Sequence, residues 1–194
     1  IAAAVTELGL PWELSADECQ SYSEDQRTCV LRDTIETYAE GGSKLLRAAI
    51  SSGNSGGGDY MFANFGGTPQ TEEPELDWAY WKKQLRLTEM LWGMEDGQLY
   101  NILSEKPEPD RVVSQDVSTQ GTVDHLVWEL TLESGERIDV NWRCYPTTFT
   151  SSAQTGRKVD DWGQHLSIRV FASEKVYDNI MEQAAKAAED RAKE

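Results

Sequence analysis

The sequence predicts an α+β fold, in which an antiparallel β-meander of about four strands packs against N-terminal, central and C-terminal helices. Three observations lead to this fold class. Apolar residues in the first half recur every three or four positions, which is typical of amphipathic helices. Residues 111–172 alternate apolar and polar side chains, which is typical of half-buried strands. The last segment returns to helical spacing.

The size and composition indicate a single domain over residues 1–194. A chain of this length buries a hydrophobic core without disulfide or metal staples. The sequence holds 7 Trp, and each large aromatic side chain buries roughly 150–250 Å². The chain is therefore expected to fold by itself.

The N-terminal part, residues 1–50, is predicted to be helical. Ser23 and Gln26 fit the capping-box pattern at the start of a helix. An apolar stripe at helical spacing follows, made of Val30, Leu31, Ile35, Tyr38, Ala39, Leu45, Leu46, Ala49 and Ile50. Two adjacent glycines, Gly41 and Gly42, either break this helix or allow it to pack closely against another element.

Residues 51–73 are predicted to form a long loop rich in glycine and aromatic residues. The stretch SSGNSGGG has the composition of a flexible linker. It lacks the lysine and the preceding strand of a phosphate-binding loop. Tyr60, Phe62 and Phe65 follow among small residues, so we expect them to anchor either the loop on its own domain or a binding partner.

A Trp-rich helix is predicted within residues 74–105. Pro74 suits its first position, and Gly93 and Gly97 suit its end. Its aromatic stripe indicates core packing. Residues 99–103 are expected to add a short turn.

The predicted sheet covers residues 111–172, and its central feature is a β-hairpin. A three-residue turn over Glu133–Gly135 pairs Leu130 with Ile138, and gives Gly135 the left-handed conformation that this turn requires. The same register pairs Trp128 with Val140 and Leu126 with Trp142. The final segment, residues 173–194, is predicted to be a helix capped by Ser173.

The three cysteines predict one disulfide. Cys19 and Cys29 lie ten positions apart in a polar stretch, which suits a small disulfide loop in an oxidising compartment, and the alternative is two separate thiols. Cys144 falls on the core side of its strand, so we expect a free, buried thiol.

The sequence motifs favour a protein without catalytic, metal or cofactor sites. No Walker, HExxH, EF-hand or GxSxG pattern occurs. His125 and His165 share the polar side of their strands, where they could meet, but without metal-ligand spacing. A Cys144–His nucleophile pair is conceivable. The core-side position of Cys144 argues against it.

The polar side of the predicted sheet carries charges of both signs. The hairpin register places Glu129 opposite Asp139, and Arg137, Arg143 and Arg169 share that side. Such a surface is either a solvated mosaic of charges or a partner-binding face. The residues assigned to partner binding are Tyr60, Phe62, Phe65, Glu129, Asp139, Arg143 and Arg169.

The net charge of −16 disfavours nucleic acids and anionic membranes as partners. Together, these features predict a non-catalytic interaction protein, an extrinsic or accessory subunit that docks on other proteins with a basic surface. A non-cytosolic compartment such as an organelle lumen, the periplasm or the extracellular space is favoured. The alternatives are a small-molecule-binding or catalytic domain with a pocket between sheet and Trp-rich helix, and an acidic inhibitor or immunity protein of a basic enzyme.

Overall fold

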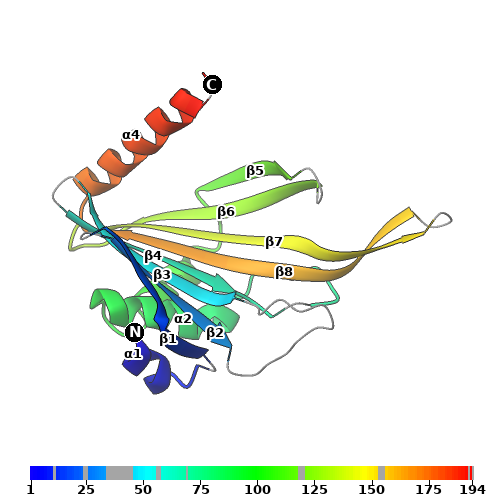
Figure 1. The fold of residues 1–194 in the computed structure, drawn as a ribbon, viewed down its shortest axis with the longest axis horizontal. Coiled ribbons are helices and arrows are strands. Elements are labelled where there is room, and N and C mark those ends of the chain that lie inside the picture. Colours follow the sequence, from blue (N-terminus) through cyan, green and yellow to red (C-terminus); the bar gives the residue numbers. More distant parts are fainter. Residues whose placement is uncertain are drawn as a thin grey trace.

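The computed structural model describes residues 1–10, 12–23, 26–33, 46–55, 58–68, 70–117, 121–152, 156–191 and 193. Within this part of the chain, the structure combines four helices with one antiparallel sheet (Figure 1). The predicted α+β class is therefore confirmed. The helices are α1 (Ala2–Glu7), α2 (Trp78–Trp92), α3 (Gln98–Glu105) and α4 (Glu174–Arg191).

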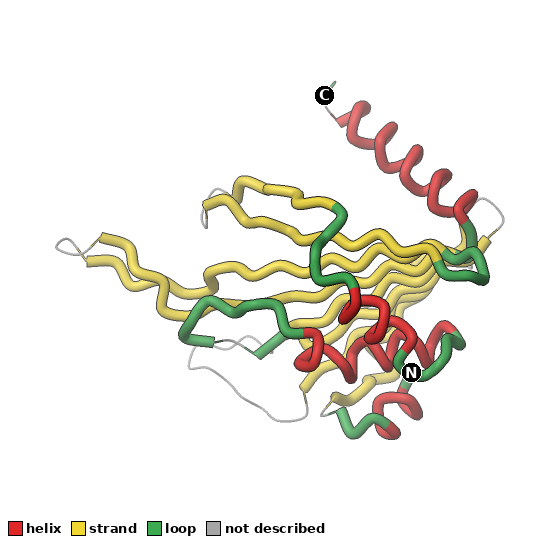
Figure 2. Tube along the Cα trace, turned by 180° about the vertical axis from the view of Figure 1, so that it is seen from behind, coloured by secondary structure: helices red, strands yellow, loops and turns green. Residues whose placement is uncertain are grey.

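The sheet has eight strands where the sequence predicts about four. Their spatial order is β1-β2-β3-β4-β8-β7-β6-β5, and every neighbouring pair is antiparallel. The strands are β1 (Trp12–Ser23), β2 (Gln26–Asp33), β3 (Leu46–Ser55), β4 (Gly58–Gly66), β5 (Arg111–Val117), β6 (Gly121–Thr131), β7 (Arg137–Ser152) and β8 (Gly156–Phe171). Helices α1, α2 and α3 lie on one side of this sheet, and α4 lies on the other (Figures 1 and 2).

Residues 1–50 are predicted to be helical, but within the described part only α1 is a helix, and β1 occupies Trp12–Ser23. The helix predicted from Ser23 onward is wrong wherever the structure describes it. Its two ends form β2 and β3, and residues 34–45 lie outside the described part. The same residues also fit a strand, since Ala48 and Ile50 alternate and are buried against the core. Pairing of β3 with β2 and β4 decides between the two periods, because strand preference depends on neighbouring strands more than on local sequence.

The predicted long loop over residues 51–73 is also wrong, because most of it forms the end of β3 and all of β4. Strand β4 lies inside the sheet between β3 and β8. Phe65 is fully buried on the core side, so it is no mobile anchor for a partner. Gly53 is needed in its strand, because a Cβ there would lie 2.6 Å from the hydroxyl of Tyr60 on the neighbouring strand.

The Trp-rich helix starts four residues later than predicted. Asp77 caps α2 by accepting a hydrogen bond from the Ala79 amide at 2.9 Å, and Gly93 ends it with a φ of 77°. The predicted turn at residues 99–103 is the two-turn helix α3. Buried Glu89 accepts hydrogen bonds from the amides of Gly97 and Leu99 at 2.9 and 2.8 Å, which fixes the junction of α2 with α3.

The predicted β6–β7 hairpin is confirmed. Leu126 lies opposite Trp142, Trp128 lies opposite Val140, and Leu130 lies opposite Ile138. Gly135 has a φ of 99°, in the left-handed region that the turn requires. The register therefore places the apolar residues of both strands against α2 and α3, and their polar residues on the opposite side.

Core side chains fill much of the space between the sheet and the Trp-rich helix, where the alternative interpretation places a pocket. Trp81 and Leu85 of α2 are fully buried there, together with Trp128 of the sheet. The Trp128 ring meets Trp78 edge-on at 5.0 Å, and its Nε1 donates to the carbonyl of Lys106 at 3.0 Å. A hollow of about 560 Å³ opens at the end of α2, against the β6–β7 turn.

Helix α4 begins on the far side of the sheet, and Ser173 caps it as predicted. The Val176 amide donates to Ser173 Oγ at 3.4 Å, and the Tyr177 ring packs edge-on against Phe171 at 5.1 Å. Beyond its first turns the helix extends away from the sheet (Figure 1). None of the described helices is long and apolar enough to cross a membrane.

The register of β1 and β2 brings Cys19 directly opposite Cys29, although their side chains lie outside the described part. Opposite residues in antiparallel strands have the Cα separation that a disulfide needs. We therefore expect the denatured, unreduced protein to show one titratable thiol, that of Cys144. A count of three thiols by Ellman titration would contradict the disulfide. Cys144 itself is half-buried and lies 3.8 Å from Glu73 Oε1, so it is less buried than the sequence predicts.

Candidate functional site

The candidate site is the side of the sheet that faces away from α1, α2 and α3, here called the open face. It is defined by three rows of side chains that run across neighbouring strands. The first row is Phe62, Arg169, Asp139 and Glu129; the second is Asn64, Ser167, Asn141, Val127 and Arg111; the third is His165, Arg143, His125 and Val113. Arg137 lies next to the first row and is included in the open face.

In the first row, Arg169 has two favourable neighbours, and the two carboxylates of this row repel each other. Arg169 stacks on the Phe62 ring with its guanidinium 4.8 Å from the centroid, and lies opposite Asp139 on β7. Asp139 is 9% exposed. Burial raises the pKa of this carboxyl, and the neighbouring Glu129 raises it further, whereas Arg111, Arg169 and Arg137 oppose the rise. Burial and the neighbouring Glu129 therefore both disfavour the charged form of Asp139.

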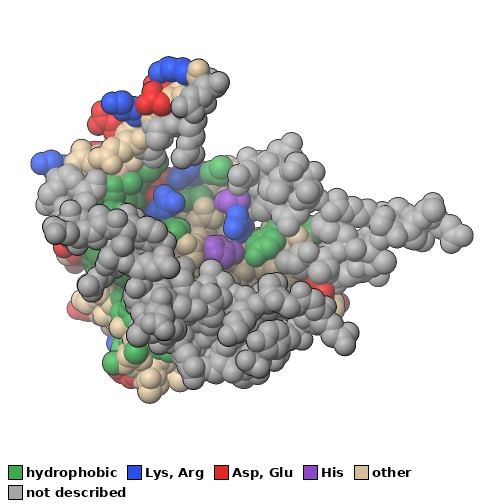
Figure 3. Space-filling view, in the orientation of Figure 1, with side chains coloured by type: hydrophobic (Ala, Val, Ile, Leu, Met, Phe, Trp, Pro, Cys, Tyr) green, Lys and Arg blue, Asp and Glu red, His purple; other side chains and the backbone are tan. Residues whose placement is uncertain are grey.

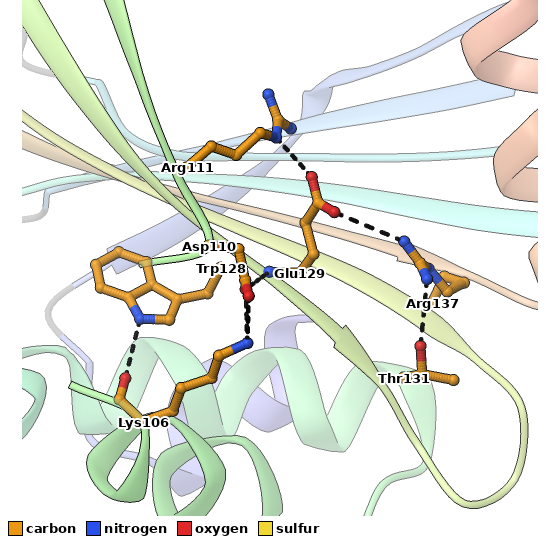
Figure 4. Close-up of polar contacts among 7 residues, drawn as sticks. All are labelled: Lys106, Asp110, Arg111, Trp128, Glu129, Thr131 and Arg137. Carbon is orange, nitrogen blue, oxygen red and sulfur yellow. Dashed lines mark hydrogen bonds and ion pairs between the residues drawn. The ribbon is translucent and has the colours of Figure 1, made fainter. Parts of the chain in front are cut away.

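Glu129 is the centre of an ion-pair network (Figure 4). Its carboxylate accepts from Arg111 Nε at 2.5 Å, and lies 3.9 Å from Arg137 Nη2. Its amide donates to Asp110 Oδ2 at 2.6 Å, and this carboxylate also accepts from Lys106 Nζ. The hydrogen bond from Lys106 lowers the pKa of Asp110, although burial opposes it. This network fixes the start of the edge strand β5 against β6.

The third row confirms that the two histidines lie near each other, with Arg143 between them. His125 faces Arg143 from β6, and His165 faces it from β8. Burial lowers the pKa of His165 to about 4, and the positive charges of Arg143 and His125 add to this lowering. His165 is therefore neutral at physiological pH. The part of the chain that the structure describes contains no group of three or more His, Cys, Asp or Glu that could hold a metal.

Polar contacts also order the second row. Ser167 Oγ donates to Asn64 Oδ1 at 2.8 Å and lies 3.4 Å from His165 Nδ1. Asn141 is the next residue of this row, on β7. The row thus offers short uncharged groups between the charged first row and the histidines.

A hollow of about 230 Å³ lies on the open face beneath α4. The space-filling view shows Lys, Arg and His side chains gathered at the centre of this side (Figure 3). Polar and apolar groups share the lining, and Met181 of α4 forms part of the rim. The lining residues are Phe62, Arg111, Val113, His125, Val127, Asp139, Asn141, Ser167, Arg169 and Met181. Such a lining can hold a polar or anionic group, and it has apolar contacts beside it.

The structure brings together six of the seven residues that the sequence assigns to partner binding. Tyr60, Phe62, Glu129, Asp139, Arg143 and Arg169 all lie on the same side of the sheet, because the strand registers align their odd or even positions. Phe65 lies on the core side. Sequence analysis missed Arg111, Asn141 and Ser167, whose positions depend on which strands are neighbours.

No family model, curated protein or solved structure matches the chain. The fold and the site together define an α+β protein whose sheet has α1, α2 and α3 on one side and, on the other, a hollow lined by polar and apolar side chains that include Arg111 and Arg169.

Proposed function

We propose that the chain is a non-catalytic interaction protein, an extrinsic or accessory subunit that docks on a larger protein assembly through its open face. One observation carries this proposal: an aromatic residue, several arginines and apolar side chains gather on a side of the sheet that α1, α2 and α3 leave uncovered. Arginine and aromatic residues are enriched where proteins bind each other.

The edge of the sheet next to the hollow supports the proposal. Val113 of β5 is 39% exposed on the open face, and Met181 across the hollow is 40% exposed. Exposed apolar residues beside a polar hollow suit a partner that covers both. Strand β5 ends the sheet, so a docked chain could also pair with its outer edge.

A small-molecule or catalytic site is the weaker reading. The predicted location between sheet and Trp-rich helix is filled by core side chains. The hollow on the open face is smaller than the roughly 300–1,000 Å³ of typical small-molecule pockets, and the larger hollow of about 560 Å³ at the end of α2 shares no residue with the three rows.

Co-purification from the native source tests the proposal with a matched pair of charge reversals. Arg169→Glu changes the open face, and Lys83→Glu makes the same charge change on an exposed position of α2. We expect the tagged wild-type chain and the Lys83→Glu variant to elute in the same stoichiometric complex, and the Arg169→Glu variant to elute alone. Loss of the complex in the Lys83→Glu variant only, or its retention in both, would refute docking through the open face.

A further inference from the structure

The open face is cationic although the whole chain carries a net charge of −16. Its rows hold Arg111, Arg137, Arg143 and Arg169 against two carboxylates, Glu129 and Asp139. The four arginines outnumber the two carboxylates, so the open face keeps a surplus of positive charge. The acidic residues that dominate the composition therefore lie elsewhere, and the charge of the docking surface is opposite to that of the chain.

Arg169 is positioned to receive an additional anion. Its guanidinium is held over the Phe62 ring at 4.8 Å, and it forms no salt bridge with any residue that the structure describes. Arg111 gives only its Nε to Glu129, so its remaining N–H groups stay available at the same hollow. A planar guanidinium that is already oriented binds a carboxylate through two parallel hydrogen bonds.

The size of the hollow indicates what kind of carboxylate enters it. A volume of about 230 Å³ accommodates one side chain, and the exposed residues Val113 and Met181 at its border suit the flanking residues of a chain. Asp139 and Glu129 reduce the positive charge that a doubly charged phosphate would meet at the hollow, which lessens its advantage over a single carboxylate. A nucleic acid would also meet the repulsion of the remaining acidic surface.

We propose that the open face binds an acidic segment of its protein partner, and that Arg169 and Arg111 hold an Asp or Glu side chain of this segment in the hollow. This inference rests on the proposed docking function. It also reverses the expectation from composition, because the partner contributes an acidic segment to the contact and not a basic surface.

Fluorescence anisotropy with a labelled, capped peptide of alternating Glu and Ser tests this inference. We expect the Glu peptide to bind the intact chain at low salt, and the matched peptide of alternating Gln and Ser not to bind. Arg169→Gln should weaken binding about tenfold, the effect of losing one charge-assisted hydrogen-bonded pair. Lys83→Gln, an equal loss of charge on α2, should leave it unchanged. Equal binding of both peptides, or equal effects of both variants, would overturn the inference.

A second pair of variants lies on α4 and leaves every residue of the sheet unchanged. Met181 lies on the exposed rim, so Met181→Glu should repel the Glu peptide, whereas Met181→Gln should not. A failure of Met181→Glu to weaken binding would place the peptide elsewhere and overturn the proposal.

Two competitors test whether the hollow instead binds a free carboxylate or a phosphate. Free glutarate should compete far less well than the peptide, because it lacks the flanking contacts. If glutarate competes as well as the peptide, the hollow takes a free carboxylate; if a single-stranded oligonucleotide binds more tightly, it takes a phosphate. Either result overturns the acidic-segment proposal.

Loss of the native complex in Arg169→Glu without binding of the Glu peptide would refute this inference alone, whereas a native complex insensitive to Arg169→Glu would refute the docking function.

Discussion

Replacing Trp128 with Ala is expected to lower the free energy of unfolding by about 3–5 kcal/mol. Trp128 is fully buried between the sheet and α2. The substitution removes the edge-on contact with Trp78 and leaves a cavity that neighbouring side chains fill only in part. It also leaves the carbonyl of Lys106 without its donor (Figure 4). For a domain of ordinary stability, about 5–15 kcal/mol, this loss is a large share of the total.

Urea titration followed by circular dichroism measures this effect. Trp128→Phe is the control, because it keeps most of the ring and removes mainly the hydrogen bond to Lys106. It should cost about 1–3 kcal/mol, clearly less than the Ala variant. Equal stability of the wild-type and Ala proteins would mean that the core between sheet and α2 is not packed as described.

The alternating half of the chain could be predicted in detail from the sequence. In β6 and β7 the period of two, the turn glycine Gly135 and the cross-strand apolar pairs all require the same register. Because register also decides which side chains share a face, the charged first row of the open face was predictable together with the hairpin.

The first half could not be predicted in the same way, because its apolar spacing fits two periods. Leu46, Ala49 and Ile50 fit a helical stripe, although they lie in a strand. These residues pair with β2 and β4, and the local sequence does not show which strands are neighbours. The aromatic residues of β4 follow the stretch SSGNSGGG directly, so they were assigned to a loop.

The hollow on the open face could not be predicted either, because it includes a residue from the half of the sheet that the sequence analysis assigned to helix and loop. Strand β4 lies between β3 and β8, and it is β4 that brings Phe62 beside Arg169. A meander of four strands in the second half would have left Arg169 without its aromatic support. The sequence therefore indicated the chemistry of the site, whereas its geometry required the order of the strands.

The histidine row predicts that acid destabilises the fold. Above pH 6.5 His165 is neutral in both the folded and the unfolded chain. Between pH 6.5 and its folded pKa of about 4, the unfolded chain gains a proton that burial, Arg143 and His125 disfavour in the fold. Stability therefore falls as the pH falls through this window. The difference between the two pKa values corresponds to about 3 kcal/mol.

Urea titrations at a series of pH values from 6.5 down to 4 measure this contribution. His165→Gln should remove about 3 kcal/mol of the pH dependence of the wild-type protein, because glutamine does not titrate. Asp139→Asn is a control of opposite sign. The pKa of Asp139 is raised in the fold by burial and by Glu129, so the wild-type gains stability from this group on acidification and the Asn variant loses that gain. Parallel pH profiles for the wild-type and His165→Gln proteins would show that His165 accepts its proton as readily in the fold as in the unfolded chain, and that the row His165, Arg143 and His125 is more hydrated than its burial implies.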